Sequence, residues 1–208
     1  MTNWFVVGAL GAGIGIVELI IAYIAYKASK QPVIANLKYF AYGMVVLAIS
    51  HLFCKALMKA TLHILAPWGV PLKAIGLTLV IYSMMLLIDE KKAKAIGAIA
   101  AVLATIFLIG SAYSLLTTKG RDWIFPTVHI LFLALLPWYV AYLSYKVYKE
   151  SGDKSALYVA TAFIVYGLAT VANMMMFGAG YSMAVSMAVS LPLRLLAEII
   201  MLYAFVGT

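Results

Sequence analysis

Long apolar stretches separated by short polar turns dominate this sequence of 208 residues. A helix needs about 20 apolar residues to cross a bilayer core of about 30 Å. Stretches of this kind predict seven spanning helices, at 4–26, 37–56, 70–88, 95–116, 123–145, 156–177 and 182–206. Because spanning helices satisfy their own backbone hydrogen bonds, we predict an all-α bundle of seven transmembrane helices. No room remains for a soluble domain, so 1–208 is expected to form one transmembrane domain.

The composition agrees with a multi-pass membrane protein. Hydrophobic residues make up 66% of the chain and charged residues 11%, against about 45–50% and about 25% in soluble domains. Such a chain cannot cover its surface with polar groups in water. This argues against soluble, disordered and nucleic-acid-binding proteins, and the single cysteine, Cys54, rules out an internal disulfide. The lipid bilayer is the expected partner, and oligomerisation or partner membrane subunits are left open.

The distribution of basic residues predicts the orientation. The predicted loops after the first, third and fifth spans hold nine of them: Lys27, Lys30, Lys38, Lys91, Lys92, Lys94, Lys146, Lys149 and Lys154. The other three loops hold five: Lys55, Lys59, Lys73, Lys119 and Arg121. Since cytoplasmic loops are enriched in Lys and Arg, we expect a cell-membrane protein with its N-terminus outside and its C-terminus in the cytoplasm. The first apolar stretch lacks a preceding basic segment and is interpreted as a retained span.

A shift of 119 residues indicates an internal repeat. It places six residues on identical ones: Ala22, Tyr23, Tyr26, Lys27, Lys30 and Tyr39 on Ala141, Tyr142, Tyr145, Lys146, Lys149 and Tyr158. Halves 1–90 and 122–208, joined by helix 95–116, would then be parallel repeats, as in some transporters. The alternative is shared composition, because aromatic and basic residues gather at every membrane interface.

Polar residues recur at every fourth position of the last predicted span: Ser182, Ser186, Ser190, Arg194 and Glu198. Four residues turn by about 400°, so this polar stripe winds slowly along one side of the helix and descends about 24 Å. Serines alone indicate close helix packing. A charge near mid-membrane costs about 2.5–3.5 kcal/mol and therefore faces the bundle interior.

Glu18 of the first span is expected at the depth of Arg194 and Glu198, about 21 Å from the outer edge. We predict a buried cluster of these three residues with a net charge of −1. Either one carboxylate is protonated, or a bound cation supplies the missing charge. The functional interpretation is a site or pathway for a proton or cation. The structural alternative is a static ion pair that joins the first and last spans.

Two histidines, His51 and His129, are both expected about 9 Å from the outer edge. Two imidazoles at one depth are what a bis-histidine haem b requires, although intramembrane histidines also simply bond neighbouring helices. His51, Cys54 and Met58 share one helix face and suit Cu(I). Lys55 beside them would oppose a cation, and methionine often only fills a core.

No nucleophile–base set, Gly-rich phosphate loop or metal-hydrolase motif occurs in the sequence, so an enzyme is not expected. The leading functional prediction is movement or sensing of a small solute or cation through the bundle. One alternative is electron transfer by a b-type cytochrome that uses His51 and His129. The other is a non-catalytic membrane subunit or scaffold.

Overall fold

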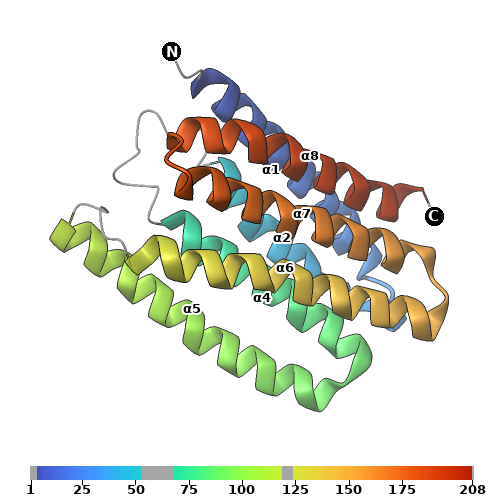
Figure 1. Ribbon diagram of the computed structural model, residues 1–208. Coiled ribbons are helices and arrows are strands. Elements are labelled where there is room, and N and C mark those ends of the chain that lie inside the picture. The colour runs from blue at the N-terminus through green and yellow to red at the C-terminus, as the bar shows by residue number, and fades with distance from the viewer. Residues whose placement is uncertain (1–3, 53–67, 119–123, 208) are drawn as a thin grey trace.

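The computed structural model describes residues 4–52, 68–118 and 124–207. Within these ranges the chain forms eight helices and no strand, which confirms the all-α class (Figure 1). They are α1 (Trp4–Ala28), the 3-10 helix η1 (Pro32–Ile34), α2 (Leu37–His51), α4 (Gly69–Ile88), α5 (Glu90–Thr118), α6 (Ile124–Ser151), α7 (Lys154–Gly178) and α8 (Met183–Val206).

Among the described residues, four helices contain segments long and apolar enough to cross a membrane: Phe5–Ala28, Pro71–Ile88, Lys154–Met176 and Val185–Val206. Large apolar side chains such as Leu19, Leu168 and Leu196 are exposed on their outer faces. An exposed apolar surface of this extent is typical of a protein surrounded by lipid. The structure therefore indicates membrane insertion, while the count of seven crossings stays a prediction.

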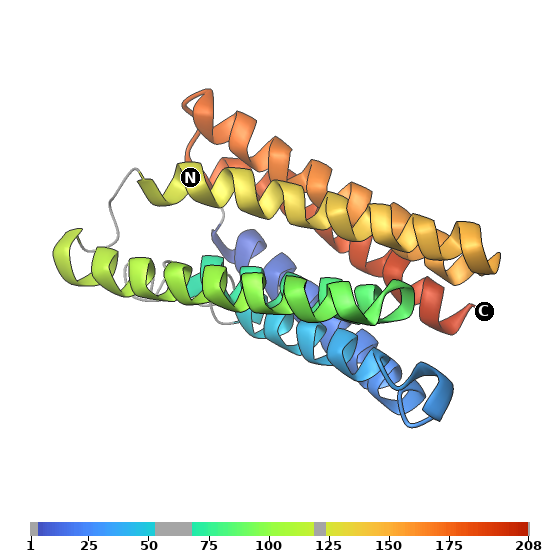
Figure 2. The ribbon, with the colours of Figure 1, turned by 90° about the horizontal axis from the view of Figure 1, so that it is seen from below.

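Six of the long helices form a closed ring. α1 packs against α2 and α8, α4 joins α2 to α6, and α7 lies between α6 and α8. α5 packs against α4 on the outside of this ring (Figures 1 and 2). The first described residues and the C-terminus lie at opposite ends of the bundle (Figure 1). One face of each ring helix is thus turned inward, where a polar side chain can escape the lipid.

The interior of the ring holds two apolar clusters. The larger one includes Phe40, Met44 and Met201, close to the turns that follow α1, α4 and α6. The smaller one includes Ile14 and Leu191, toward the opposite end. Buried polar side chains lie between these two clusters along α1 and α8. The core therefore has a polar layer between two apolar ones.

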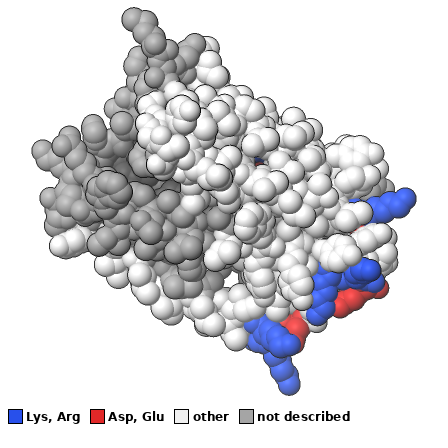
Figure 3. All heavy atoms as spheres, in the orientation of Figure 1, with Lys and Arg blue, Asp and Glu red and all other residues white. Residues whose placement is uncertain are grey.

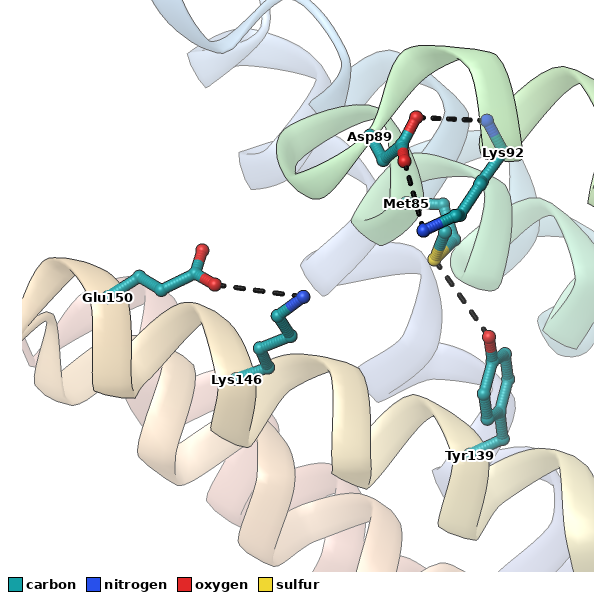
Figure 4. Close-up of polar contacts among 6 residues, drawn as sticks. All are labelled: Met85, Asp89, Lys92, Tyr139, Lys146 and Glu150. Carbon is teal, nitrogen blue, oxygen red and sulfur yellow. Dashed lines mark hydrogen bonds and ion pairs between the residues drawn. The ribbon is translucent and has the colours of Figure 1, made fainter.

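The turn between α4 and α5 is much shorter than the predicted loop. α4 ends at Ile88 and α5 begins at Glu90, so that Asp89 alone connects them. Asp89 is extended (φ −160°, ψ 101°), and its Oδ1 accepts the backbone N–H of Lys92 at 3.1 Å (Figure 4). This is an N-cap, in which a side-chain oxygen satisfies a free donor of the first helical turn. The charged stretch expected as a loop thus begins α5.

The turn between α6 and α7 is also shorter than the predicted loop. α6 continues to Ser151, beyond its predicted end, and α7 begins at Lys154. Gly152 has a φ of 73°, a left-handed conformation that glycine adopts without steric cost at a helix C-terminus. Asp153 then accepts the backbone N–H of Ser155 at 2.9 Å. A two-residue connection therefore holds α6 and α7 side by side.

Charged side chains gather at one end of the face shown in Figure 3, where the turns after α4 and α6 lie. Three exposed i,i+3 or i,i+4 ion pairs form in these helices: Lys92–Asp89, Lys94–Glu90 and Lys146–Glu150. The hydrogen bond from Lys94 to Glu90 raises the pKa of that lysine. The described remainder of this face carries hardly any charge in the figure, as a lipid-facing surface requires.

The Asp89 cap predicts a pH-dependent contribution to stability. The backbone N–H of Lys92 lowers the pKa of the Asp89 carboxyl group. A carboxyl group whose folded-state pKa is lowered stabilises above its unfolded pKa and loses this effect as pH falls through the folded value. We expect Asp89→Ala to lower the melting temperature in detergent at pH 7, and the gap from wild type to close toward pH 3. Asp89→Asn, which keeps an acceptor oxygen, is the control, and a gap that widens in acid would contradict the cap.

Candidate functional site

The polar layer of the ring is built from six side chains, each at most 4% exposed. They come from five helices: Glu18 of α1, His51 of α2, Lys73 of α4, Thr170 of α7, and Arg194 and Glu198 of α8. We call these six residues the central cluster. Burying ionisable groups is costly unless they pair or bind a ligand, so the contacts within the cluster decide its role.

Glu18 and His51 make the shortest polar contact of the cluster. His51 Nδ1 lies 2.8 Å from Glu18 Oε2, and both side chains are fully buried. Close packing of α1 on α2 allows this contact: a Cβ at Gly15, one turn before Glu18, would lie 2.6 Å from the Leu52 side chain. The imidazole N–H donates to the carboxylate, or the carboxyl group donates to the imidazole, because both groups can carry the proton. This pair can therefore hold and pass on a proton.

Arg194 contacts α7. Its Nη2 donates to Thr170 Oγ1 at 3.2 Å, and its guanidinium carbon lies 5.1 Å from the ring centroid of Tyr166, within the range of a cation–π interaction. Among the described residues no ion pair joins Arg194 to Glu18 or Glu198. Arg194 nonetheless acts on both carboxyl groups through its charge. The polar and cation–π contacts of Arg194 in the described part of the chain are thus with Thr170 and Tyr166.

Glu198 has a fully buried carboxyl group. Within the described part of the chain, neither of its oxygens has a hydrogen-bond partner, and Oε1 of Glu18 has none either. Buried polar atoms in folded proteins are nearly always satisfied by protein, water or an ion. These three carboxyl oxygens can therefore each take up a proton, accept a hydrogen bond from water or bind a cation.

The three serines of the predicted polar stripe bond within α8. Ser182 is the N-cap and accepts the backbone N–H of Val185 at 3.4 Å. Ser186 donates to the carbonyl of Ser182 at 3.1 Å, and Ser190 donates to that of Met187 at 3.4 Å. Small residues with internally bonded hydroxyls let neighbouring helices approach closely. The serines thus have a packing role, and the ionisable groups carry the chemistry of the site.

No described contact brings the two histidines together. His51 is held by Glu18, while the side chain of His129 on α6 lies outside the described residues, as do Cys54 and Met58. α2 packs against α1 and α4, and α6 packs against α4 and α7. Among the described residues no group of three or more His, Cys, Asp or Glu side chains could hold a metal ion. The haem and copper sites therefore gain no support.

Three members of the central cluster were not predicted to lie in it: His51, Lys73 and Thr170. Lys73 is the one that changes the net charge of the cluster. The charge count treats Lys73 as a loop residue at the edge of the predicted span 70–88, but it lies in the second turn of α4 and is 3% exposed. Its positive charge attracts the Glu18 carboxylate electrostatically. With Lys73 included, the ionised cluster has two carboxylates and two cations, so its net charge is zero rather than −1. One sequence signal could have placed Lys73 in the cluster: Pro71-Leu72-Lys73 recurs as Pro192-Leu193-Arg194, and Arg194 was predicted to be buried.

Comparison of the sequence with protein-family models gives no match, and comparisons with curated proteins and with solved structures give none either.

A double-mutant cycle measures the Glu18–His51 interaction. Removing one partner of a buried pair costs about 3–5 kcal/mol, because the other polar group is left uncompensated. We expect Glu18→Leu and His51→Leu each to reduce stability strongly, and the double variant to cost clearly less than the sum of the two. Chemical unfolding in mixed micelles provides the free energies. Additive losses would show that the two side chains do not interact.

Proposed function

We propose that this protein moves or senses a small solute or cation through a bundle of seven transmembrane helices, with the central cluster as its binding site. The observation that carries the proposal is the fully buried Glu18–His51 hydrogen bond of 2.8 Å in the same layer as Glu198. Ionisable residues inside the membrane commonly mark ion pathways and proton relays. A carboxyl–imidazole pair beside a second carboxyl group has the composition of such a relay.

The incomplete pairing of the carboxyl groups favours this role over a scaffold. A purely structural cluster would gain most by joining Arg194 to Glu198, which is one helical turn away. Instead Arg194 bonds Thr170 at 3.2 Å, and both Glu198 oxygens lack a partner among the described side chains. A proton or a cation at Glu198 would supply the missing interaction.

We further propose that the ring consists of two parallel repeats, α1–α2–α4 and α6–α7–α8, with α5 as the linker. In each set the second helix packs against the first and the third. The third helix of each set packs against the first helix of the other: α4 against α6, and α8 against α1. This matching pattern is what an axis along the membrane normal produces in transporters with parallel repeats.

Matching side-chain contacts support the repeat. Lys30 Nζ lies 5.9 Å from the ring centroid of Tyr26, and Lys149 Nζ lies 5.8 Å from that of Tyr145. Two edge-to-face tyrosine pairs also correspond: Tyr39 with Tyr82 at 5.0 Å, and Tyr158 with Tyr203 at 5.1 Å. Shared membrane composition accounts for similar residue types, but it does not account for equal contacts between different helices.

The basic residues of the cluster, like Tyr82 and Tyr203, are related by an offset of 121 residues, two more than the 119-residue shift that relates the first two helices of each set. Lys73 of α4 and Arg194 of α8 each follow a Pro-Leu pair, and both are buried, at 3% and 4% exposure. The carboxyl groups are not equivalent, because Glu18 lies on α1 of the first set and Glu198 on α8 of the second. The proposed repeat thus supplies paired cations, while each half adds a carboxyl group at a different place.

Accessible-cysteine labelling tests the span count and the orientation. In a Cys54→Ala background we expect Gln31→Cys and Asp153→Cys to react with a membrane-impermeant thiol reagent only from the cytoplasmic side. Tyr181→Cys, in the exposed turn before α8, should react only from outside, because lysine-rich turns face the cytoplasm. Labelling of all three positions from one side would contradict the proposed topology.

Reconstituted vesicles test the central cluster. We expect the wild-type protein to admit protons or monovalent cations under an imposed membrane potential, or to bind such a cation. Glu198→Gln should abolish this activity, because an amide can neither take up a proton nor balance a cation. Glu150→Gln, at an exposed position of α6, is the matched control and should behave as wild type. Wild-type protein that neither moves nor binds any of these ions would favour the scaffold.

A further inference from the structure

A groove of about 570 Å³ runs along the outside of the ring between α6 and α7, which lie side by side (Figures 1 and 2). Its lining includes Trp138, Tyr142 and Tyr145 from α6, and Leu157, Thr161 and Leu168 from α7. Most of these side chains are exposed, and the α7 residues belong to a candidate membrane span. The groove therefore opens toward lipid.

The length of the groove matches one leaflet of a bilayer. From Leu157 to Leu168 the rise along α7 is about 16 Å, and half of a hydrocarbon core is about 15 Å. At the end of the groove farther from the turn between α6 and α7, Trp138 lies against α7, because Gly167 has no Cβ that would clash with its indole ring. A groove of this length accommodates an acyl chain, whereas a packed transmembrane helix would need contacts over about 30 Å.

The end of the groove at the turn between α6 and α7 carries charges of both signs, with Lys149 and Lys154 next to Glu150 and Asp153, and Glu150 pairs with Lys146 at 3.7 Å. Lys149 Nζ lies 5.8 Å from the ring of Tyr145, which lines the groove. Lys154 is exposed at the start of α7, next to Leu157 along the chain. Neither lysine takes part in an ion pair among the described residues. Basic side chains at this level attract anionic headgroups.

One position distinguishes this groove from the equivalent place in the first set of helices. Under the 119-residue shift, Thr161 corresponds to Tyr42. The ring of Tyr42 on α2 lies 6.3 Å from that of Tyr26 on α1, so these two half-exposed rings meet across the outer surface of α1 and α2. Thr161 has no ring, and its hydroxyl donates back to the carbonyl of Leu157 at 3.0 Å. The groove between α6 and α7 is thus lined by a small side chain at the position where the first set of helices has a tyrosine.

We propose that this groove binds one acyl chain of an anionic phospholipid from the leaflet at the charged end, with the headgroup phosphate at Lys149 and Lys154. The apolar lining holds the chain, and the two lysines select the headgroup. This site lies on the outside of the ring and is independent of the central cluster.

Native mass spectrometry with added phosphatidylglycerol or phosphatidylcholine of equal chain length tests the proposal. We expect one phosphatidylglycerol on the wild-type protein and about tenfold weaker binding to Thr161→Tyr, since losing contact with two methylenes already costs that factor. The reciprocal variant Tyr42→Thr should bind a second lipid. Lys149→Gln/Lys154→Gln should lose the preference for phosphatidylglycerol over phosphatidylcholine.

Fluorescence quenching by acyl-brominated phosphatidylglycerol locates the chain. Quenching should be strong in the wild-type protein and markedly reduced in Trp138→Phe, and Thr161→Tyr should protect Trp138. This readout and the Tyr42→Thr variant keep the test decisive if Thr161→Tyr folds poorly. Equal lipid binding and equal quenching in wild type and Thr161→Tyr would overturn the proposal. So would a dimer that covers α6 and α7 and excludes lipid.

Discussion

The hydrogen bond between Glu18 and His51 is the interaction on which the arrangement of the polar layer depends. A carboxyl group facing lipid would be too costly, so α1 has to turn Glu18 into the ring. There it meets His51 at 2.8 Å, because Gly15 lets α1 and α2 approach closely. The closed ring follows from the same constraint, since α8 also carries charges that must avoid lipid.

The two apolar clusters on either side of the polar layer separate the central cluster from the two ends of the ring. Ile14 and Leu191 lie toward one end of the ring, and Phe40 and Met201 toward the other. Between them the low dielectric strengthens every interaction among the charged groups. A proton or cation that reaches Glu198 therefore has to pass an apolar layer. Under the proposed function, these apolar layers would keep the site from being an open pore.

The sequence was sufficient to predict the fold class and the presence of charged groups in the interior. Helical class follows from apolar length, and the cost of exposing Glu18, Arg194 or Glu198 to lipid predicts that they turn inward; the structure places all three in the ring. The pairing could not be predicted in the same way. The rise per residue of upright helices that start at the membrane edge predicts depths for Glu18 and His51 that differ by about 12 Å. The two side chains can therefore meet only because the real helices depart from that arrangement.

Lys73 and the turns show a second limit of sequence reasoning. A lysine just after a Pro-rich segment looks like a loop residue in the sequence. Lys73 is buried only because α4 packs against α2 and α6. Charged residues 89–92 likewise resemble a loop, although Asp89 caps α5 and the next residues are helical. In both cases composition is ambiguous, and the decision depends on neighbours that are distant along the chain.

In the proposed repeat, Lys73 and Arg194 are matching residues, whereas Glu18 and Glu198 are not, and this makes the central cluster asymmetric. Two parallel repeats with identical chemistry would place equal charges around an axis, and a single small ion would then have two equal sites. Here Lys73 and Arg194 are both buried, while Glu18 bonds His51 and Glu198 has no hydrogen-bond partner in the described part of the chain. One half thus holds its carboxyl group in a fixed pair, and the other leaves it open. Under the proposed function and repeat, an asymmetry of this kind would define a single binding position, at Glu198, within a symmetric frame.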